Sequence, residues 1–321
     1  MDKLSDQSLY FITLQHCNSL LKEEIQARYP SWKFNFGHHN FLCYETDRTR
    51  DFEEIHDLPL ILKIGAGKLL YAGDEAGLEE AVEKARLDYD IVSTHFWDLV
   101  EEEGKMGDRK VRGLVLDIIH YNDQQFSLGL RLQVRGDFAP YKGSSPIPCP
   151  DIKMKHGYQK MGEAFKHFRP HVGHEEVFLD IGCAPGGAAY YLLEHGYRVI
   201  GVDINDVDNE LRDTFKEGFL HLKQPADEIN VKHLKGLPPI DWVVSDLDLS
   251  WGDVVPFLSK LISKLDDCLG LFFHIRMDDH FSFSDLEKIE NEIKDAGYSE
   301  MRFGLLPSHS KEFCLFAKKD D

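Results

Sequence analysis

The chain has 321 residues, of which 42% are hydrophobic and 29% are charged. That length is enough for two domains, each with its own buried core. The formal net charge of −19 excludes a uniformly basic surface, so contact with a nucleic acid would require a local basic face. No run approaches the ~20 apolar residues that cross a bilayer, and the sequence does not begin with a secretory pattern. The six cysteines form no C-x-x-C pair, and a cytoplasmic protein with reduced thiols, no metal and no membrane contact is expected.

The first part of the chain, residues 1–145, is expected to form an α+β domain. Its clearest helix is Ala76–Arg86, in which Leu78, Val82 and Ala85 fall on one face. A pair of histidines, His38–His39, suggests a metal site, but its Gly- and Asn-rich context is more typical of a loop. Strands are predicted at Leu9–Leu14, Phe41–Tyr44, Leu60–Ile64, Val111–Ile119 and Phe126–Val134.

A change in composition marks the boundary between two domains. Residues 139–153, APYKGSSPIPCPDIK, contain four prolines, one glycine and two serines, as is typical of a linker. Residues 146–321 then alternate strand and helix patterns, which predicts a doubly wound, Rossmann-like α/β sheet. A helix is expected at Ala188–His195, ended by Gly196. The predicted strands are Val177–Asp180, Arg198–Asp203, Phe219–Leu222, Asp241–Ser245, Leu269–Ile275, Met301–Leu305 and Phe313–Ala317, the last two antiparallel.

A glycine-rich turn follows the first strand of the second domain. The strand ends at Asp180, and Gly182, Gly186 and Gly187 are expected to let the backbone pass close to a ligand. Asp203 lies at the tip of the next strand, where a carboxylate accepts both ribose hydroxyls of an adenosine cofactor. The predicted cofactor site consists of Asp180, Gly182, Cys183, Ala184, Pro185, Gly186, Gly187, Asp203 and Asp246.

The spacing of this turn separates two classes of cofactor. A dinucleotide needs G-x-G-x-x-G, because the middle glycine admits the pyrophosphate at the helix N-terminus. The turn here is G-x-x-x-G-G, with Ala184 and Pro185 interrupting that spacing. Asp180 places an acid beside the turn, which repels a pyrophosphate but suits the amino group of S-adenosylmethionine (SAM). The sequence therefore predicts SAM as the cofactor.

This part of the sequence resembles a known family. The segment DIGCAPGG, residues 180–187, resembles the SAM-binding motif of the FtsJ-like RNA ribose 2′-O-methyltransferases. The resemblance continues in YQKMGEAF, which places Lys160 on the family's first catalytic lysine, and in the strand ending SDLD, which places Asp246 on its catalytic aspartate. HSKEFCLFAK places Glu312 on the family's glutamate. The resemblance implies methyl transfer to a ribose 2′-hydroxyl of RNA.

The nearest likeness within the family is to the bacterial group that methylates a cytidine of large-subunit (23S) ribosomal RNA. That group carries an N-terminal THUMP-like domain, which is an RNA-binding module. The segments RYPSWKFNFGHHNFLCYE and FSLGLRLQVRGDFAPYKGSSPIP resemble parts of it. The resemblance thus implies ribosomal RNA as the partner.

One position departs from the family pattern. The family's second catalytic lysine belongs at the end of the fifth strand, where LFFHIRMDD has Arg276. The predicted catalytic set is therefore Lys160, Asp246, Arg276 and Glu312. Methyl transfer to an alcohol needs in-line alignment and a partly deprotonated hydroxyl. Clustered cations would lower the pKa of a lysine while the acids orient it. The alternative is that these four residues are polar groups at the strand ends with no catalytic role.

One stretch is basic in this acidic chain. Residues 153–169, KMKHGYQKMGEAFKHFR, carry five Lys and Arg against a single acid. The predicted RNA contacts are Lys153, Lys155, Tyr158, Lys166 and Arg169, with the rings of Tyr158 and Phe168 stacking on bases. The alternative is a solvated helix face.

Three functions remain open from the sequence. The first is SAM-dependent methylation of a ribose 2′-hydroxyl, and the second is a catalytically silent relative that binds SAM or RNA. Arg276 and the acidic net charge favour the second. The third is a methyltransferase for a protein or small molecule, which leaves Lys160, Asp246 and Glu312 unexplained.

Overall fold

The computed structural model describes residues 6–99, 103–105, 112–122, 124–134, 145, 147–150 and 154–320. The chain divides into two compact units, Met1–Lys142 and Gly143–Asp321. In the described part of the chain, no helix is long and apolar enough to cross a membrane.

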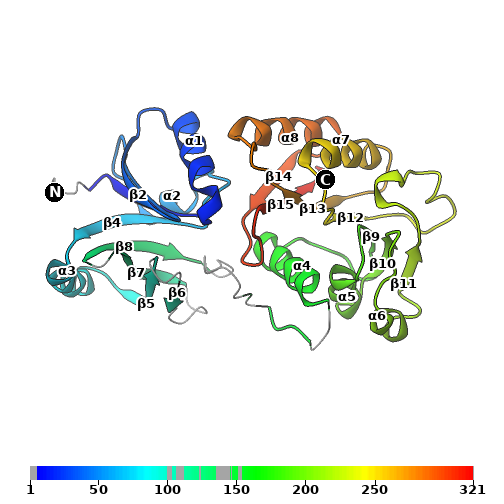
Figure 1. The fold of residues 1–321 in the computed structure, drawn as a ribbon, viewed down its shortest axis with the longest axis horizontal. Helices are drawn as coiled ribbons and strands as arrows, with labels where there is room; N and C mark the ends of the chain where they lie inside the picture. The colour runs from blue at the N-terminus through cyan, green and yellow to red at the C-terminus, as the bar shows by residue number, and fades with distance from the viewer. Residues whose placement is uncertain are drawn as a thin grey trace. The chain divides into compact units, whose positions relative to one another are not determined.

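The first unit is built on a mixed sheet whose strands lie in the order β2-β3-β1-β4-β8-β7-β5-β6 (Figure 1). Neighbouring strands are antiparallel, except that β5 and β7 run parallel. This confirms an α+β unit. The elements are β1 Ser8–Ile12, α1 Asn18–Arg28, β2 Lys33–His38, β3 Phe41–Glu45, α2 Phe52–His56, β4 Gly65–Gly73, α3 Glu75–Asp88, β5 Ile91–Asp98, β6 Glu103–Lys105, β7 Gly113–Asn122 and β8 Gln125–Gln133.

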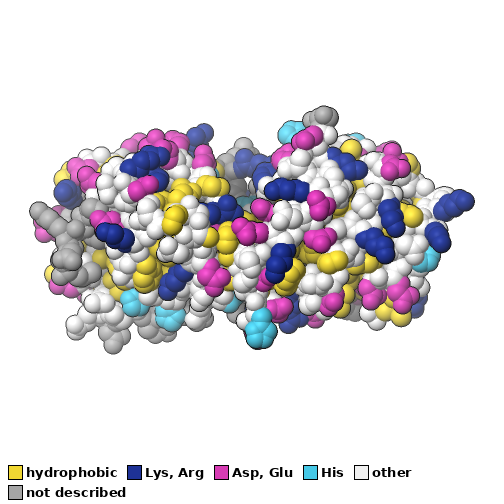
Figure 2. All heavy atoms as spheres, turned by 90° about the horizontal axis from the view of Figure 1, so that it is seen from above, with side chains coloured by type: hydrophobic (Ala, Val, Ile, Leu, Met, Phe, Trp, Pro, Cys, Tyr) yellow, Lys and Arg dark blue, Asp and Glu magenta, His cyan; other side chains and the backbone are white. Residues whose placement is uncertain are grey.

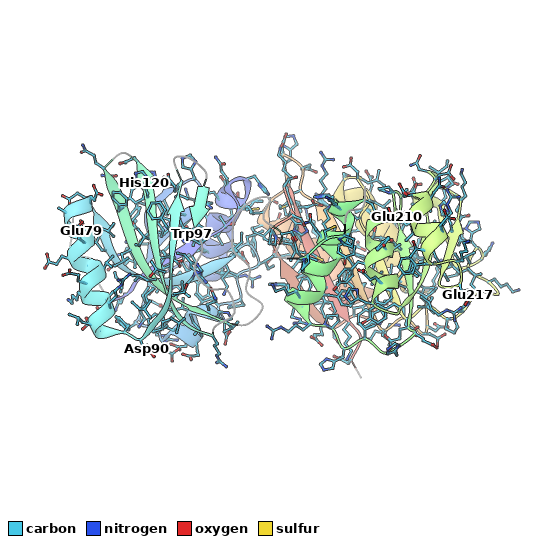
Figure 3. All side chains as sticks on the ribbon, turned by 90° about the horizontal axis from the view of Figure 1, so that it is seen from below. Glu79, Asp90, Trp97, His120, Glu210 and Glu217 are labelled. Atoms are coloured by element: carbon cyan, nitrogen blue, oxygen red, sulfur yellow. The ribbon has the colours of Figure 1, made fainter. Side chains whose placement is uncertain are left out.

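The interior of the first unit contains a charged group that is fully hydrogen-bonded. Trp97, labelled in Figure 3, is buried, and its Nε1 donates to Asp117 at 3.0 Å. The same carboxylate accepts from the Tyr10 hydroxyl at 2.5 Å and from Arg131 Nε at 2.6 Å. Because a buried charge is tolerated only when paired, these contacts make Asp117 a structural group of the core.

In the first unit, one predicted strand is absent and one of the two paired histidines lies in a strand. Leu60–Ile64 is not a strand, and β4 begins only at Gly65. The backbone N–H groups of Ile61 and Leu62 donate to the buried carboxylate of Glu24 at 2.7 and 3.0 Å, so they are not paired in the sheet. His38, at the end of β2, stacks on Tyr121 with ring centroids 4.5 Å apart.

The second unit has the strand order β11-β10-β9-β12-β13-β15-β14. The first five strands are parallel, and β15 is antiparallel to both β13 and β14. Helices α7 and α8 cover one face of this sheet and α4, α5 and α6 the other (Figure 1). The elements are α4 Lys155–Phe168, β9 Val177–Ile181, α5 Gly187–Glu194, β10 Arg198–Val202, α6 Asn209–Thr214, β11 Phe219–Leu222, β12 Trp242–Ser245, α7 Trp251–Ile262, β13 Gly270–Arg276, α8 Phe283–Asp295, β14 Glu300–Gly304 and β15 Glu312–Lys318.

This topology confirms the Rossmann-like sheet. All seven predicted strands are present, including the antiparallel pair β14–β15. The strand order reverses between β9 and β12, where doubly wound sheets bind their ligands at the carboxyl ends of the strands. Asp180 lies near the carboxyl end of β9, and Asp203 and Asp246 directly follow β10 and β12.

Candidate active site

The turn between β9 and α5 has the backbone shape that its glycines predict. Gly182 and Gly186 adopt φ angles of +84° and +117°, in the region that other residues rarely adopt. The turn is held by its own hydrogen bonds, since Gly182 N donates to Val202 O at 2.9 Å and Asp208 N donates to Pro185 O at 2.9 Å. Cys183 contributes packing, because its buried sulfur lies against Gly201 of β10.

Gly187 also lies against the backbone of α4. A Cβ atom at this position would lie 2.4 Å from the Met154 carbonyl oxygen and 2.6 Å from Tyr158 N. The missing side chain therefore admits the backbone of α4. Close packing of α4 on α5 places Lys160, in the second turn of α4, at the end of the sheet.

Three carboxylates act on one another at the carboxyl ends of β9, β10 and β12. Burial, with smaller effects from the charges of Asp246 and Asp203, raises the pKa of Asp180 to about 7. Asp180 Oδ2 is buried and has no hydrogen-bond partner among the described residues. Asp203 Oδ2 accepts from Ala184 N at 3.0 Å, and its Oδ1 accepts from Asn205 N at 2.8 Å. These bonds leave lone pairs on Asp203 for further donors.

These features fit SAM and not a dinucleotide. An unpaired, buried carboxylate oxygen in a region of negative charge favours a cationic ligand, and SAM carries both a sulfonium and an ammonium. The same charges would repel a pyrophosphate. Asp180 and the turn after it would hold the methionine part of SAM, and Asp203 would hold the ribose.

Lys160 joins three elements at the end of the sheet. It is only 5% exposed, and its Nζ donates to both carboxylate oxygens of Asp246 at 2.9 Å. The same ammonium donates to Glu312 Oε2, at the start of β15, at 2.7 Å. Three of the four predicted catalytic residues are thus in direct contact. A lysine held between two acids has a fixed position and little rotamer freedom.

The charges in this cluster correct one expectation. Burial would lower the pKa of Lys160, but the charges of Asp246 and Glu312 outweigh it and raise that pKa. The expectation of a lysine whose pKa is lowered by clustered cations is therefore wrong, because its contacts are two carboxylates. Burial favours the neutral form of Asp246. The positive charges of a protonated His274 and of Lys160 outweigh burial, so the pKa of this carboxyl is lowered overall. Because His274 is neutral at pH 7, Lys160 is the effective partner there.

Arg276 is placed differently from the other three residues. It pairs with Glu312 in the backbone register of β13 and β15, but its side chain forms an ion pair with Asp248. The two partners are exposed, with 55% of the Arg276 side chain and 80% of the Asp248 side chain accessible. Exposed ion pairs contribute little to stability, so Arg276 is available to a ligand.

Sequence reasoning missed two histidines behind this cluster. His274 lies two residues before Arg276, and alternation along the strand puts their side chains on one face of the sheet. Leu306 N donates to His309 Nδ1 at 3.1 Å, so a neutral His309 carries its proton on Nε2. This Nε2 lies 3.0 Å from His274 Nδ1, to which it donates. His274 is therefore the tautomer with hydrogen on Nε2. Burial, opposed by Asp246 and supported by Lys160 and His156, lowers the pKa of His274 to about 4.

A third histidine was also missed. His156 lies one helical turn before Lys160 on α4, and its charge acts on the pKa values of Asp246, Glu312 and His274. Residues four positions apart in a helix lie on the same face, so the spacing of His156 and Lys160 in the sequence could have revealed that they are neighbours.

The predicted RNA contacts separate into exposed and buried residues. Lys155, Lys166 and Arg169 are exposed on α4 or at its end. Tyr158 is wrong as a stacking ring, because it is buried and its hydroxyl donates to Glu194 at 2.5 Å. Phe168 is also buried, stacked on Phe316 with ring centroids 5.4 Å apart. Lys153 lies outside the described residues.

The surface shown in Figure 2 carries charged side chains of both signs. On the face of the second unit that carries α7 and α8, basic and acidic side chains are interspersed. Lys155, Lys166 and Arg169 belong to the opposite helical layer, which holds α4.

Comparison with known proteins identifies the family of this second unit. Residues 154–269 match the FtsJ-like methyltransferase family. The unit therefore contains an FtsJ-like methyltransferase domain, and its cofactor is SAM. No curated protein matches the chain.

Several solved structures resemble the chain at low identity. A protein from Lactococcus lactis described as a hemolysin has 17% identity, covering 52% of this chain and 88% of its own, with a TM-score of 0.43. A possible methylase from Clostridium difficile 630 has 11% identity over 98% of both chains, with a TM-score of 0.38. The fibrillarin/Nop5p complex has 12% identity over 51% of this chain and 83% of its own, with a TM-score of 0.40. TM-scores below 0.5 carry no information on the chemistry.

Proposed function

We propose that this protein methylates a ribose 2′-hydroxyl of RNA and that its substrate is large-subunit ribosomal RNA. The observation that carries the proposal is Lys160, held at 2.7–2.9 Å by Asp246 and Glu312 at the same end of the sheet as the SAM turn. A buried, doubly paired ammonium is costly to build, and a lysine used only for stability gains little from burial. Its position suits a donor to the oxygen that accepts the methyl group.

SAM, when bound, supplies a methyl group on a positively charged sulfur. The protein's own contribution is alignment, since in-line displacement depends on the approach of the hydroxyl oxygen. Lys160 turns one of its two Asp246 bonds to that oxygen and stabilises its developing negative charge, while the remaining bonds to Asp246 and Glu312 keep the ammonium in place. Arg276 carries a permanent charge and acts as a fixed cation for the RNA backbone near the target ribose.

RNA binding is assigned to two regions. Lys155, Lys166 and Arg169 lie on the α4 side of the catalytic unit, where phosphate contacts would bring a strand to Lys160. The first unit, with its THUMP-like sequence segments, supplies the remaining contacts. A local basic face of this kind is compatible with the net charge of −19, because only the contact surface needs to be positive.

The test is methyl transfer to defined RNA. Ribosomal RNA from cells that lack this gene is incubated with the protein and isotope-labelled SAM, and its digested nucleosides are analysed by mass spectrometry. The expected product is a single 2′-O-methylated nucleoside that ribosomal RNA from parental cells already contains. Lys160→Ala should abolish its formation, whereas Lys264→Ala, an exposed lysine after α7, should not. Label in protein or small molecules, with none in RNA, would contradict the proposal.

A second candidate is a catalytically silent relative that binds SAM and RNA. Arg276 in place of the family's lysine, engaged with Asp248, favours it. The same assay separates the two functions. A silent protein binds SAM in calorimetry and transfers no label to any ribosomal RNA, and Arg276→Lys would restore transfer.

A further inference from the structure

None of Arg276, Lys160 and His274 is placed to accept the proton of the 2′-hydroxyl. Arg276 remains protonated at all physiological pH values, because guanidinium has a pKa above ~12. Lys160 donates to Asp246 and Glu312, which favour its charged form. His274 is buried, and its Nδ1 already accepts from His309. A different group is therefore needed for this step.

His156 lies where such a group would act. It precedes Lys160 by four residues on α4, so the two side chains are neighbours on one face of the helix. Unlike Lys160, it is exposed, and so it is open to a substrate. Its charge reaches Asp246 on β12, Glu312 on β15 and His274 on β13, which are the groups that surround Lys160.

The imidazole of His156 is also chemically available. Within the described part of the chain it forms no hydrogen bond and no ion pair, so a ring nitrogen is available to accept a proton. Histidine is the side chain that most readily exchanges a proton near neutral pH.

We propose that His156 is the general base of this enzyme, the residue that takes the proton from the ribose 2′-hydroxyl during methyl transfer. This inference rests on the function proposed above. As the new O–CH₃ bond forms, the bond between sulfur and the methyl carbon breaks, and its electron pair stays on sulfur to give the neutral thioether. The hydroxyl proton passes to the free ring nitrogen of His156, and the imidazolium later releases it to water. Lys160 keeps its proton and its position throughout.

The first test measures single-turnover methyl transfer to ribosomal RNA from cells lacking the gene. His156→Ala should slow the transfer by about 10²- to 10⁴-fold, which is the usual contribution of a general base. Affinities for SAM and RNA should stay within about twofold of the parent values, since the residue acts only on the transferred proton. His156→Gln should be slow as well, and added imidazole should speed up the alanine variant. His233→Ala, at an exposed histidine elsewhere in the unit, is the matched control and should behave as the parent.

The second test does not depend on activity. Diethyl pyrocarbonate acylates accessible neutral imidazoles, and mass spectrometry locates the label. His156 and His233 should both react in the free protein. After addition of the RNA and S-adenosylhomocysteine, the demethylated cofactor, His156 should become protected at least several-fold while His233 remains reactive.

The outcomes separate this inference from the proposed function. If the parent protein methylates no RNA, the proposed function fails, and the role of His156 fails with it. If the parent is active and His156→Ala keeps its rate, only the inference is wrong. It is also wrong if the alanine variant loses RNA affinity in proportion to its rate, or if bound RNA leaves His156 reactive, because the residue would then be an RNA contact or a bystander.

Discussion

Replacing Asp180 by asparagine should stabilise the ligand-free catalytic unit, by an amount that grows with pH. Asp180 is 1% exposed, and burial, followed by the charges of Asp246 and Asp203, raises the pKa of its carboxyl to about 7. In the unfolded chain an aspartate has a pKa of ~3.9. Because the folded state binds the proton more tightly, the contribution of Asp180 to stability is fully present below about pH 4 and is lost as the pH rises through 7.

The two pKa values set the size of this effect. Relative to low pH, the raised pKa of Asp180 lowers the stability of the folded protein by about 1–2 kcal/mol at pH 5 and about 4 kcal/mol at pH 8. Asparagine carries no charge and avoids this cost. The gain in unfolding free energy from Asp180→Asn should therefore be about 2–3 kcal/mol larger at pH 8 than at pH 5. Packing effects of the substitution cancel in that difference, because they do not depend on pH.

Urea unfolding at the two pH values measures the difference, and hydrogen exchange of the β9 amides assigns it to the second unit, because the two units need not unfold together. Asp227→Asn, at an exposed position, is the control and should have an equal effect at both pH values.

In the parent, SAM affinity should rise between pH 6 and pH 8, since a cation binds the ionised carboxyl, and Asp180→Asn should lose that rise. A gain from Asp180→Asn that is the same at pH 5 and pH 8 would refute the assignment of Asp180 as a buried carboxyl with a raised pKa.

Three further predictions concern ligand binding and catalysis. Asp203→Ala should weaken SAM binding about tenfold to hundredfold in calorimetry, because it removes charge-assisted acceptors for the ribose. Replacing Lys155 and Lys166 by glutamine should flatten the slope of log RNA affinity against log salt by about 1.5 units, since each phosphate contact contributes about 0.7–0.9. In the methylation assay, Lys160→Ala should abolish transfer while Arg276→Lys keeps or raises it, and SAM binding should survive both changes.

Each of these predictions has an outcome that contradicts it. Unchanged SAM affinity in Asp203→Ala, or tight NAD binding by the parent, would exclude the cofactor site as described. An unchanged salt slope would show that Lys155 and Lys166 form only a solvated helix face. Full activity in Lys160→Ala would remove the basis for assigning a role to the Lys160 cluster.

Much of the catalytic unit was predictable because its signals are local. Alternating strand and helix patterns predicted all seven strands of its sheet, including the antiparallel pair β14–β15. Gly182 and Gly186 predicted a glycine-rich turn after the first strand, and in the structure both residues adopt positive φ angles there. In the first unit, Leu60–Ile64 looked like a strand because the run is apolar. Its backbone N–H groups donate instead to Glu24, a residue 37 positions away from Ile61, which no local pattern reveals.

The sequence by itself determined which residue types lie at each strand end, and through them the class of cofactor. The tertiary structure alone decided which of those residues touch. Lys160 and Glu312 are 152 positions apart and meet only because α4 packs closely on α5 through Gly187. The same packing buries Tyr158, which a basic and aromatic sequence placed on the surface. Burial and charge at a site depend on every element packed around it, so the raised pKa values of Lys160 and Asp180 become visible only in the folded chain.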